Sequence, residues 1–228
     1  MEIEYPCGIK VKLVNVSPET YPEGFSREHI IAAAARTSFD NFDREKSYDD
    51  DVRLIRRLRK DGHTSPFEMA SVMFQIKAPK FVTIQLLRHR TMSFNEESQR
   101  YHKVKEEFFK PSCDEEFIRL QDSVNKQSSV KGEVSDELLL TVREAEEAVE
   151  IIFELYNRMI ELGMARECAR FCLPMATFST IVINVDLHNL MKFLRLRLAD
   201  DAQYETRLVA QGMLELARRM FPISLEDF

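Results

Sequence analysis

The sequence predicts an α+β fold in which one compact domain, spanning residues 1–228, combines long helices with a small sheet. Its length is typical of a single well-packed domain. Apolar residues repeat at helical spacing over 136–162 and again over 187–198. Between these segments, residues 180–185 are strongly β-branched and indicate a strand. Long helices that alternate with a few well-separated strands are typical of the α+β class.

The first quarter of the chain predicts one strand and two helices. Residues 9–14 indicate an edge strand. Ser26 is placed to cap an alanine-rich helix that runs to Arg36. A second helix is expected over 49–59, because aspartates open it and arginines close it, the order that the helix macrodipole favours. We interpret the arginines at 53–59 as a solvated helix end, with ligand binding as the alternative.

The next two elements lead into the most polar segment of the chain. Alternation over 70–76 predicts a strand, and Pro79 stands where a new helix begins. An apolar stripe on this helix is formed by Phe81, Ile84 and Leu87. Helical spacing places Gln85, Arg88 and His89 together on another face, where they can act on one ligand.

The second half predicts a loop, a long helix, a short helix that ends before Pro174, a strand and two further helices. Residues 111–135 are polar and rich in turn formers, which indicates a mobile loop or insertion inside the domain. Ser135 is the expected N-cap of the helix 136–162, whose apolar face suits either the monomer core or a contact between subunits. Asp186 is the expected N-cap of the helix after the last strand, and a final helix is expected over 202–220.

Composition and charge exclude several classes of protein. The net charge of −6 disfavours general nucleic-acid binding, which usually needs a basic surplus. No window approaches the roughly 18 consecutive apolar residues of a membrane span, and the first residues lack the pattern of a signal peptide. We therefore expect a cytoplasmic protein that binds neither nucleic acid nor membrane.

The cysteine pattern predicts no metal site. Cys7, Cys113, Cys168 and Cys172 include no Cys-x-x-Cys pair, and none has the neighbours of a zinc ligand. We expect all four to be reduced thiols, with redox catalysis by Cys168 as the minor alternative.

The segment from Arg88 to Tyr101 carries the densest chemistry in the sequence. It holds three arginines, a histidine and two glutamates within fourteen residues. Guanidinium groups match phosphate in bidentate geometry. The acceptors Asn95, Glu96 and Ser98 also need partners, which sugar hydroxyls or the edge of a base supply. This mixture of donors and acceptors indicates a nucleotide or dinucleotide ligand.

Phosphates in this protein must be held mainly by side chains. The sequence has only six glycines, and it contains no Gly-x-Gly-x-x-Gly motif after a strand and no Walker loop. Arg88, His89 and Arg90 are therefore the leading phosphate ligands. The alternative is surface ion pairing of these arginines with Glu96 or Glu97.

The triplet Arg88-His89-Arg90, followed after seven residues by Ser98, resembles a signature of the flavin-dependent thymidylate synthases. Four further segments are similar to blocks of that family and occur in the family's order, at 35–39, 62–68, 166–174 and 196–197. Together the five blocks span residues 35 to about 205, which is most of the chain.

This resemblance implies an enzyme that makes dTMP from dUMP. In this family methylenetetrahydrofolate donates the carbon, NADPH reduces FAD, and reduced FAD supplies the reducing equivalents. The family's fold is a compact α+β unit that assembles as a homotetramer, with sites built by several subunits. The resemblance thus implies FAD as cofactor and NADPH and methylenetetrahydrofolate as co-substrates.

The resemblance also implies a role for each matching residue. The residues expected to bind FAD are His63, Ser65, Arg88, His89, Arg90, Asn95 and Glu96. The residues expected to bind the substrate are Gln85, Arg88, Glu96, Ser98, Gln99, Arg100, Arg170 and Arg197. Ser98, Arg100 and Arg170 are expected at the substrate phosphate. Arg197 is the expected catalytic residue, because its charge beside the uracil ring stabilises the N3-deprotonated form.

Two of these residues have alternative interpretations. Ser98 can be a nucleophile if His89 and Glu96 supply a base and an acid within reach. His63 precedes a probable turn, where a histidine is more often structural. Three positions depart from the family pattern and are left out of the expected FAD site, namely Asp186, Lys192 and Asp201.

Two other functions remain open from the sequence. One is a related flavoenzyme that methylates another uracil nucleotide, such as UMP. The other is a non-catalytic nucleotide-binding protein. A flavin absorption spectrum from the purified protein would exclude most non-catalytic nucleotide-binding proteins.

Overall fold

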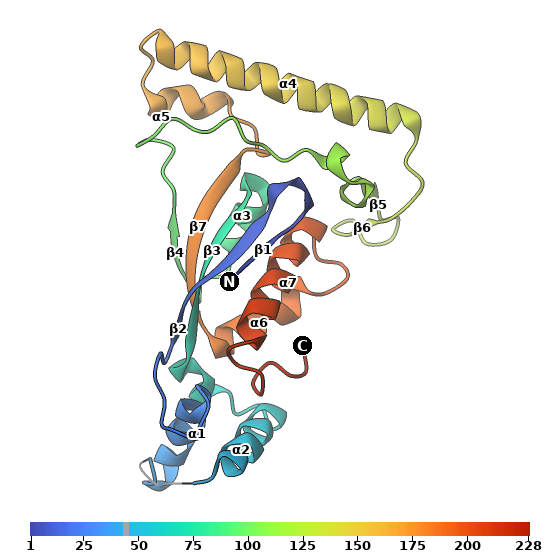
Figure 1. The fold of residues 1–228 in the computed structure, drawn as a ribbon. Helices are drawn as coiled ribbons and strands as arrows, with labels where there is room; N and C mark the ends of the chain where they lie inside the picture. The colour runs from blue at the N-terminus through green and yellow to red at the C-terminus, as the bar shows by residue number, and fades with distance from the viewer. Residues whose placement is uncertain (43–45) are drawn as a thin grey trace.

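A five-stranded antiparallel sheet in the order β1-β2-β3-β7-β4 forms the centre of the computed structural model, which describes residues 1–42 and 46–228 (Figure 1). The strands are β1 (Glu2–Glu4), β2 (Lys10–Ser17), β3 (Ser71–Pro79), β4 (Ser93–Glu96) and β7 (Phe178–Asp186). Strands β3 and β7 pair along their whole length, from Ser71 opposite Asp186 to Pro79 opposite Phe178. The predicted α+β class is confirmed.

Helices cover one face and both ends of this sheet. The helices in the described part of the chain are α1 (His29–Arg36), α2 (Tyr48–Lys60), α3 (Lys80–Leu86), α4 (Asp136–Glu161), α5 (Arg166–Ala169), α6 (Leu187–Arg197) and α7 (Tyr204–Arg218). Helices α6 and α7 lie against the sheet, α4 crosses one end, and α1 and α2 lie at the opposite end (Figure 1).

The main core lies between the sheet and helices α6 and α7. Val72, Phe74 and Ile76 on β3 are fully buried in the same cluster as Met213 of α7. Gln75, which points to the other face of the sheet, is exposed. This alternation is typical of an antiparallel sheet with one face in the core.

A second, smaller core lies under α4. Its buried members are Val104, Phe153, Tyr156 and Ala169, and the Tyr156 hydroxyl accepts a hydrogen bond of 3.0 Å from the Val104 amide. Leu140, Ile151 and Leu155 of the same helix remain more than half exposed. Helix α4 therefore buries one side in the monomer and leaves apolar side chains on another.

Most predicted elements are confirmed, with corrections at their edges. Ser135 accepts a hydrogen bond of 3.2 Å from Leu138 N, and Asp186 accepts one of 2.9 Å from Asn189 N, so both are N-caps as predicted. The expectation of an edge strand at 9–14 is wrong, because β2 lies between β1 and β3. The predicted cap at Ser26 is also wrong, because α1 begins at His29 with Glu28 in the N-cap position.

The helix after Pro79 is shorter than predicted, and it buries a different face. Its core-facing residues are Val82, Thr83 and Leu86. Ile84 and Leu87, which were expected in an apolar stripe, are 45% and 39% exposed. Because α3 ends at Leu86, Arg88 and His89 lie in the following turn, and the predicted helical face with Gln85 does not form.

The arginines of α2 make structural ion pairs, which supports the non-ligand interpretation. Arg56 and Arg59 both pair with Glu226 near the C-terminus, at 2.9 and 2.6 Å. Arg53 and Arg57 pair within α2 or at its end, with Asp50 and Asp61. The interpretation as a solvated end needs one correction, because the Arg59 side chain is only 9% exposed.

The segment 111–135 contains short regular elements. These are two 3-10 turns at Pro111–Cys113 and Glu115–Phe117 and a two-stranded ladder of β5 (Leu120–Gln121) with β6 (Ser129–Val130). Phe117 and Ile118 are buried. The mobility of the segment stays a prediction.

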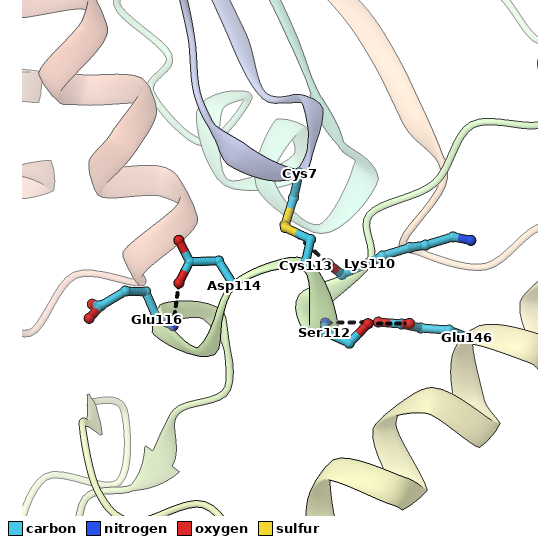
Figure 2. The surroundings of a disulfide bond; sticks show 7 residues. All are labelled: Cys7, Lys110, Ser112, Cys113, Asp114, Glu116 and Glu146. Carbon is cyan, nitrogen blue, oxygen red and sulfur yellow. Dashed lines mark hydrogen bonds between the residues drawn. A yellow bond between two sulfur atoms is a disulfide. The ribbon is translucent and has the colours of Figure 1, made fainter.

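A disulfide bond joins Cys7, in the turn between β1 and β2, to Cys113 at the start of this segment (Figure 2). Their Cα atoms are 6.0 Å apart, within the usual disulfide range of about 4.4–6.8 Å. Beside the bond, Ser112 donates from its amide and its hydroxyl to Glu146 of α4, at 2.9 and 2.6 Å. The expectation of four reduced thiols is wrong for this pair, whereas Cys168 and Cys172 are free.

Candidate functional site

The Arg88-His89-Arg90 triplet lies in the turn between α3 and β4. Arg88 and Arg90 are exposed, and neither guanidinium has a hydrogen-bond or ion-pair partner within residues 1–42 and 46–228. Glu96 and Glu97 instead approach Lys80 and His102. The alternative of surface ion pairing with these glutamates is therefore wrong, and both guanidinium groups are available to an anionic ligand.

His89 and Arg197 meet although they are far apart in the sequence. Arg197 Nε donates to His89 Nε2 at 2.9 Å, and the His89 ring packs edge-on against Phe193 with centroids 4.8 Å apart. Burial, and then the positive charge of Arg197, lowers the pKa of His89, so the neutral ring that accepts this bond is favoured. Burial also lowers the pKa of Arg197. The pair fixes the position of one guanidinium edge and leaves the other edge open.

Gln85 lies beside Arg197 on the wall of a cavity of about 510 Å³. Its amide is bonded to Gln203, and its Oε1 accepts a hydrogen bond of 3.2 Å from the buried hydroxyl of Thr206. The remaining cavity wall is formed by Phe117, Arg119, Gln121, Lys126, Gln127, Ser128, Ser129, Asp201, Ala202 and Glu205. The structure thus brings together two of the predicted substrate-binding residues, Gln85 and Arg197.

Glu96 is held by a network of its own at the end of β4. Its Oε1 accepts hydrogen bonds from Lys80 Nζ at 2.8 Å and from Thr83 Oγ1 at 3.1 Å. All three side chains are largely buried. Because both bonds end on Oε1, Oε2 is the oxygen left to accept from a ligand.

The predicted phosphate ligands Ser98, Arg100 and Arg170 gather around Glu167. Arg100 pairs with the Glu167 carboxylate at 2.7 Å, and Arg170 Nε donates to the Glu167 carbonyl at 3.4 Å. The Ser98 hydroxyl accepts from the Arg100 amide at 3.3 Å. Both arginines are exposed, so the structure shows a shallow cationic surface rather than a closed pocket.

Ser98 lacks the partners that a nucleophile requires. Within the described parts of the chain, no histidine or carboxylate accepts a hydrogen bond from its hydroxyl. A serine nucleophile needs a base within hydrogen-bond reach. His89, the base considered in the nucleophile interpretation, is bonded to Arg197. The geometry therefore gives the nucleophile interpretation no support, and the phosphate role of Ser98 stays a prediction.

Ser65 begins the 3-10 turn Ser65–Met69, which contacts α1, and His63 follows shortly after α2. Ser65 lines a different cavity, of about 600 Å³, together with Phe42 and Met69. His63 is exposed. Neither residue lines the cavity beside Arg197.

The remaining expected residues are accessible but isolated. Asn95 is exposed on β4 and Gln99 is partly exposed in the turn after it. Of the positions that depart from the family pattern, Asp186 is used as a helix cap, Lys192 is exposed and Asp201 lines the cavity beside Arg197.

Several residues of this site carried no recognisable signal in the sequence. Glu96 is held by Lys80 and Thr83, and Gln85 is held by Gln203 and Thr206. These contacts depend on the packing of α3 against β4 and α7. Glu167 lies in the family-like block at 166–174. Its membership of that block was therefore a sequence signal for the site.

In the residues that the structure describes, neither a metal centre nor a membrane span is found. In the residues it describes, no group of three or more histidine, cysteine or acidic side chains is placed to hold a metal ion. Among the same residues, no helix combines the length and the apolar character needed to cross a bilayer.

Comparisons with known proteins converge on one family. The family model described as Thymidylate synthase complementing protein (Thy1) matches residues 24–223. The flavin-dependent thymidylate synthase of Thermus thermophilus is 39% identical over 201 residues, which cover 88% of this chain and 71% of the relative. The enzyme of the same name from Dictyostelium discoideum is 35% identical over 222 residues, which cover 96% of this chain and 71% of the relative.

Solved structures agree with the sequence relatives. A crystal structure of the UMP/dUMP methylase PolB from Streptomyces cacaoi, bound with 5-Br dUMP, superposes with a TM-score of 0.81 at 32% identity. The match covers 98% of this chain and 96% of the other. A structure of the same methylase bound with 5-Br UMP gives a TM-score of 0.80 at 33% identity.

Proposed function

Because the chain belongs to the Thy1 family of thymidylate synthase complementing proteins, we propose that it methylates dUMP to dTMP with FAD as cofactor. Methylenetetrahydrofolate donates the carbon and NADPH is the reductant in this proposal. The single observation that carries it is the hydrogen bond from Arg197 to His89, because Arg197 lines the same cavity as Gln85. This arrangement holds a guanidinium where the charge of a uracil ring can develop.

The residues present fit a flavin dinucleotide. Its diphosphate needs several donors, and Arg88 and Arg90 offer exposed guanidinium groups without partners among the described residues. His89 is held neutral and oriented by Arg197, so it can donate from Nδ1 to a further acceptor. Asn95 and Glu96 follow on β4 and complete the set of expected contacts. When bound in its reduced form, FAD supplies a hydride.

The chain's own groups position and activate the substrate. Arg197 stabilises negative charge on the ring, and burial strengthens this effect relative to water. Gln85 offers an amide to the same ring, and Glu96 Oε2 accepts from a sugar hydroxyl. Ser98, Arg100 and Arg170 bind the substrate phosphate, which displaces Glu167 from Arg100.

The absence of His63 and Ser65 from the lining of the cavity beside Arg197 supports a homotetramer in which different chains complete one site. The exposed apolar side chains on α4, including Leu140 and Ile151, supply a surface for such assembly. Light scattering should give a mass of four chains of 26.7 kDa. The proposed location is the cytoplasm.

UMP is the second candidate substrate, because the superposed PolB structures are of a UMP/dUMP methylase. The purified protein is first tested for a flavin absorption spectrum. Single-turnover assays with methylenetetrahydrofolate and NADPH then compare dUMP with UMP. We expect dTMP as the product from dUMP, and the comparison decides which of the two nucleotides is preferred. A colourless protein that stays inactive after incubation with FAD contradicts the proposal.

A further inference from the structure

The cavity beside Arg197 has a second wall that no predicted site residue accounts for. This wall is the hairpin that runs from Arg119 to Val130 and contains β5 and β6. Arg119, Lys126 and Ser128 line the cavity from this hairpin, opposite Gln85 and Arg197.

Arg119 is held in a fixed position at this wall. Its Nε donates to Ser129 Oγ at 3.0 Å, and its Nη2 donates to the Ser129 carbonyl at 3.1 Å. Its guanidinium carbon lies 5.4 Å from the ring centroid of Tyr204, which packs at 5.3 Å against the buried ring of Phe117. Arg119 Nη1 has no hydrogen-bond partner in the described residues. A rigid guanidinium with a free edge is preorganised for an anion.

The turn that carries Lys126 and Ser128 is closed by side-chain hydrogen bonds. Gln121 Nε2 lies 3.2–3.3 Å from the carbonyl oxygens of Asp122, Lys126 and Ser128 and closes the turn. Asp122 Oδ1 accepts from the amides of Val124 and Asn125, and these bonds hold the pKa of Asp122 below its usual value. Such a turn presents its outer side chains without a large ordering cost.

The charges around the cavity favour an anionic guest. Arg119, Lys126 and Arg197 line it, whereas its acidic residues are the exposed Asp201 and the buried Glu205. Burial raises the pKa of Glu205, which disfavours its charged form. The ammonium, hydroxyl and guanidinium donors on the hairpin suit the several oxygens of one phosphate group.

We propose that the Arg119–Val130 hairpin binds a phosphate monoester through Arg119, Lys126 and Ser128. The identity of the ligand rests on the proposed function, which supplies two sources, the 2′-phosphate of NADPH and the 5′-phosphate of the uracil nucleotide. The reductant is the expected source, because Ser98, Arg100 and Arg170 already form a phosphate group elsewhere on the chain.

The test compares Arg119→Gln and Lys126→Gln with Lys131→Gln in the FAD-loaded full-length protein. Lys131 is the matched control because it follows the same hairpin, pairs with Glu116 and does not line the cavity. Steady-state assays give KM for NADPH, NADH and dUMP. Calorimetry measures adenosine 2′-monophosphate against adenosine, and dUMP against deoxyuridine. Lys126 is exposed, so Lys126→Gln should leave the fold of the hairpin intact. This variant therefore tests the proposal even if Arg119→Gln loosens the hairpin.

We expect both site variants to lose about tenfold or more in the preference for NADPH over NADH and for adenosine 2′-monophosphate over adenosine. Lys131→Gln should change neither. A loss confined to dUMP relative to deoxyuridine supports the phosphate site and assigns it to the substrate. Unchanged phosphate preferences in both site variants overturn the proposal. The calorimetry needs no turnover, so it remains decisive even if the protein forms no dTMP.

Discussion

The disulfide between Cys7 and Cys113 should contribute several kcal/mol to the stability of the fold. It closes a loop of 106 residues in the unfolded chain. In the chain-entropy model, a loop of this size destabilises the unfolded state by about 4.8 kcal/mol at 25 °C. Cys113→Ser should therefore lower the free energy of unfolding by up to that amount, because residual structure in the unfolded chain reduces the effect.

Urea unfolding at one fixed protein concentration measures this change. The midpoint should fall by roughly 2 M in Cys113→Ser, and a reducing agent should shift the unmodified protein by a similar amount. Cys168→Ser is the matched control, because that thiol is exposed and free. Thiol titration of the denatured, unreduced protein should find two reactive groups. Four reactive thiols, together with a midpoint that does not respond to reductant, would refute the reasoning.

Three further predictions concern the site. Arg197→Lys should keep the fold and FAD but slow turnover roughly a hundredfold, because lysine lacks the planar fork; a near-normal rate contradicts the role of Arg197 at the ring. Arg90→Ala should weaken FAD binding by about 1.5–3 kcal/mol in fluorescence titrations, with Arg57→Ala as a surface control that changes nothing. The free energy of unfolding should fall as the pH drops below about 6.5, because burial and Arg197 lower the pKa of His89 and the unfolded chain takes up the proton first. His89→Gln should remove this part of the slope, and an identical pH dependence in both proteins would exclude His89 as its source.

Local patterns predicted the fold well where one element determines its own structure. The β-branched run of β7 and the caps at Ser135 and Asp186 depend on neighbouring residues only, and both caps form as expected. The end of α3 and the place of β2 in the sheet were wrong. Strand order depends on pairing across long sequence distances, which periodicity does not encode.

In the candidate site, too, single residues were predicted from the sequence, whereas contacts between distant segments were not. Helical spacing pointed to Gln85 and the resemblance to Arg197, and the structure brings these two residues to one cavity. Sequence spacing did not reveal the bond from Arg197 to His89, because α6 and the turn after α3 meet only through tertiary packing. The pairing of Cys7 with Cys113 was missed for a similar reason, since the spacing of two cysteines does not report their distance in space.

His63 and Ser65 do not line the cavity beside Arg197, so two inactive variants of the proposed tetramer should complement each other. If one chain supplies His63 and a neighbour supplies Arg197, then a homotetramer of either single variant has no complete site. Mixed tetramers of His63→Ala and Arg197→Lys chains contain some sites built entirely from unaltered residues. Two nearly inactive preparations that are unfolded and refolded together should therefore regain part of the activity. The same logic makes activity sensitive to dilution, because separated chains retain every residue and still lose the site.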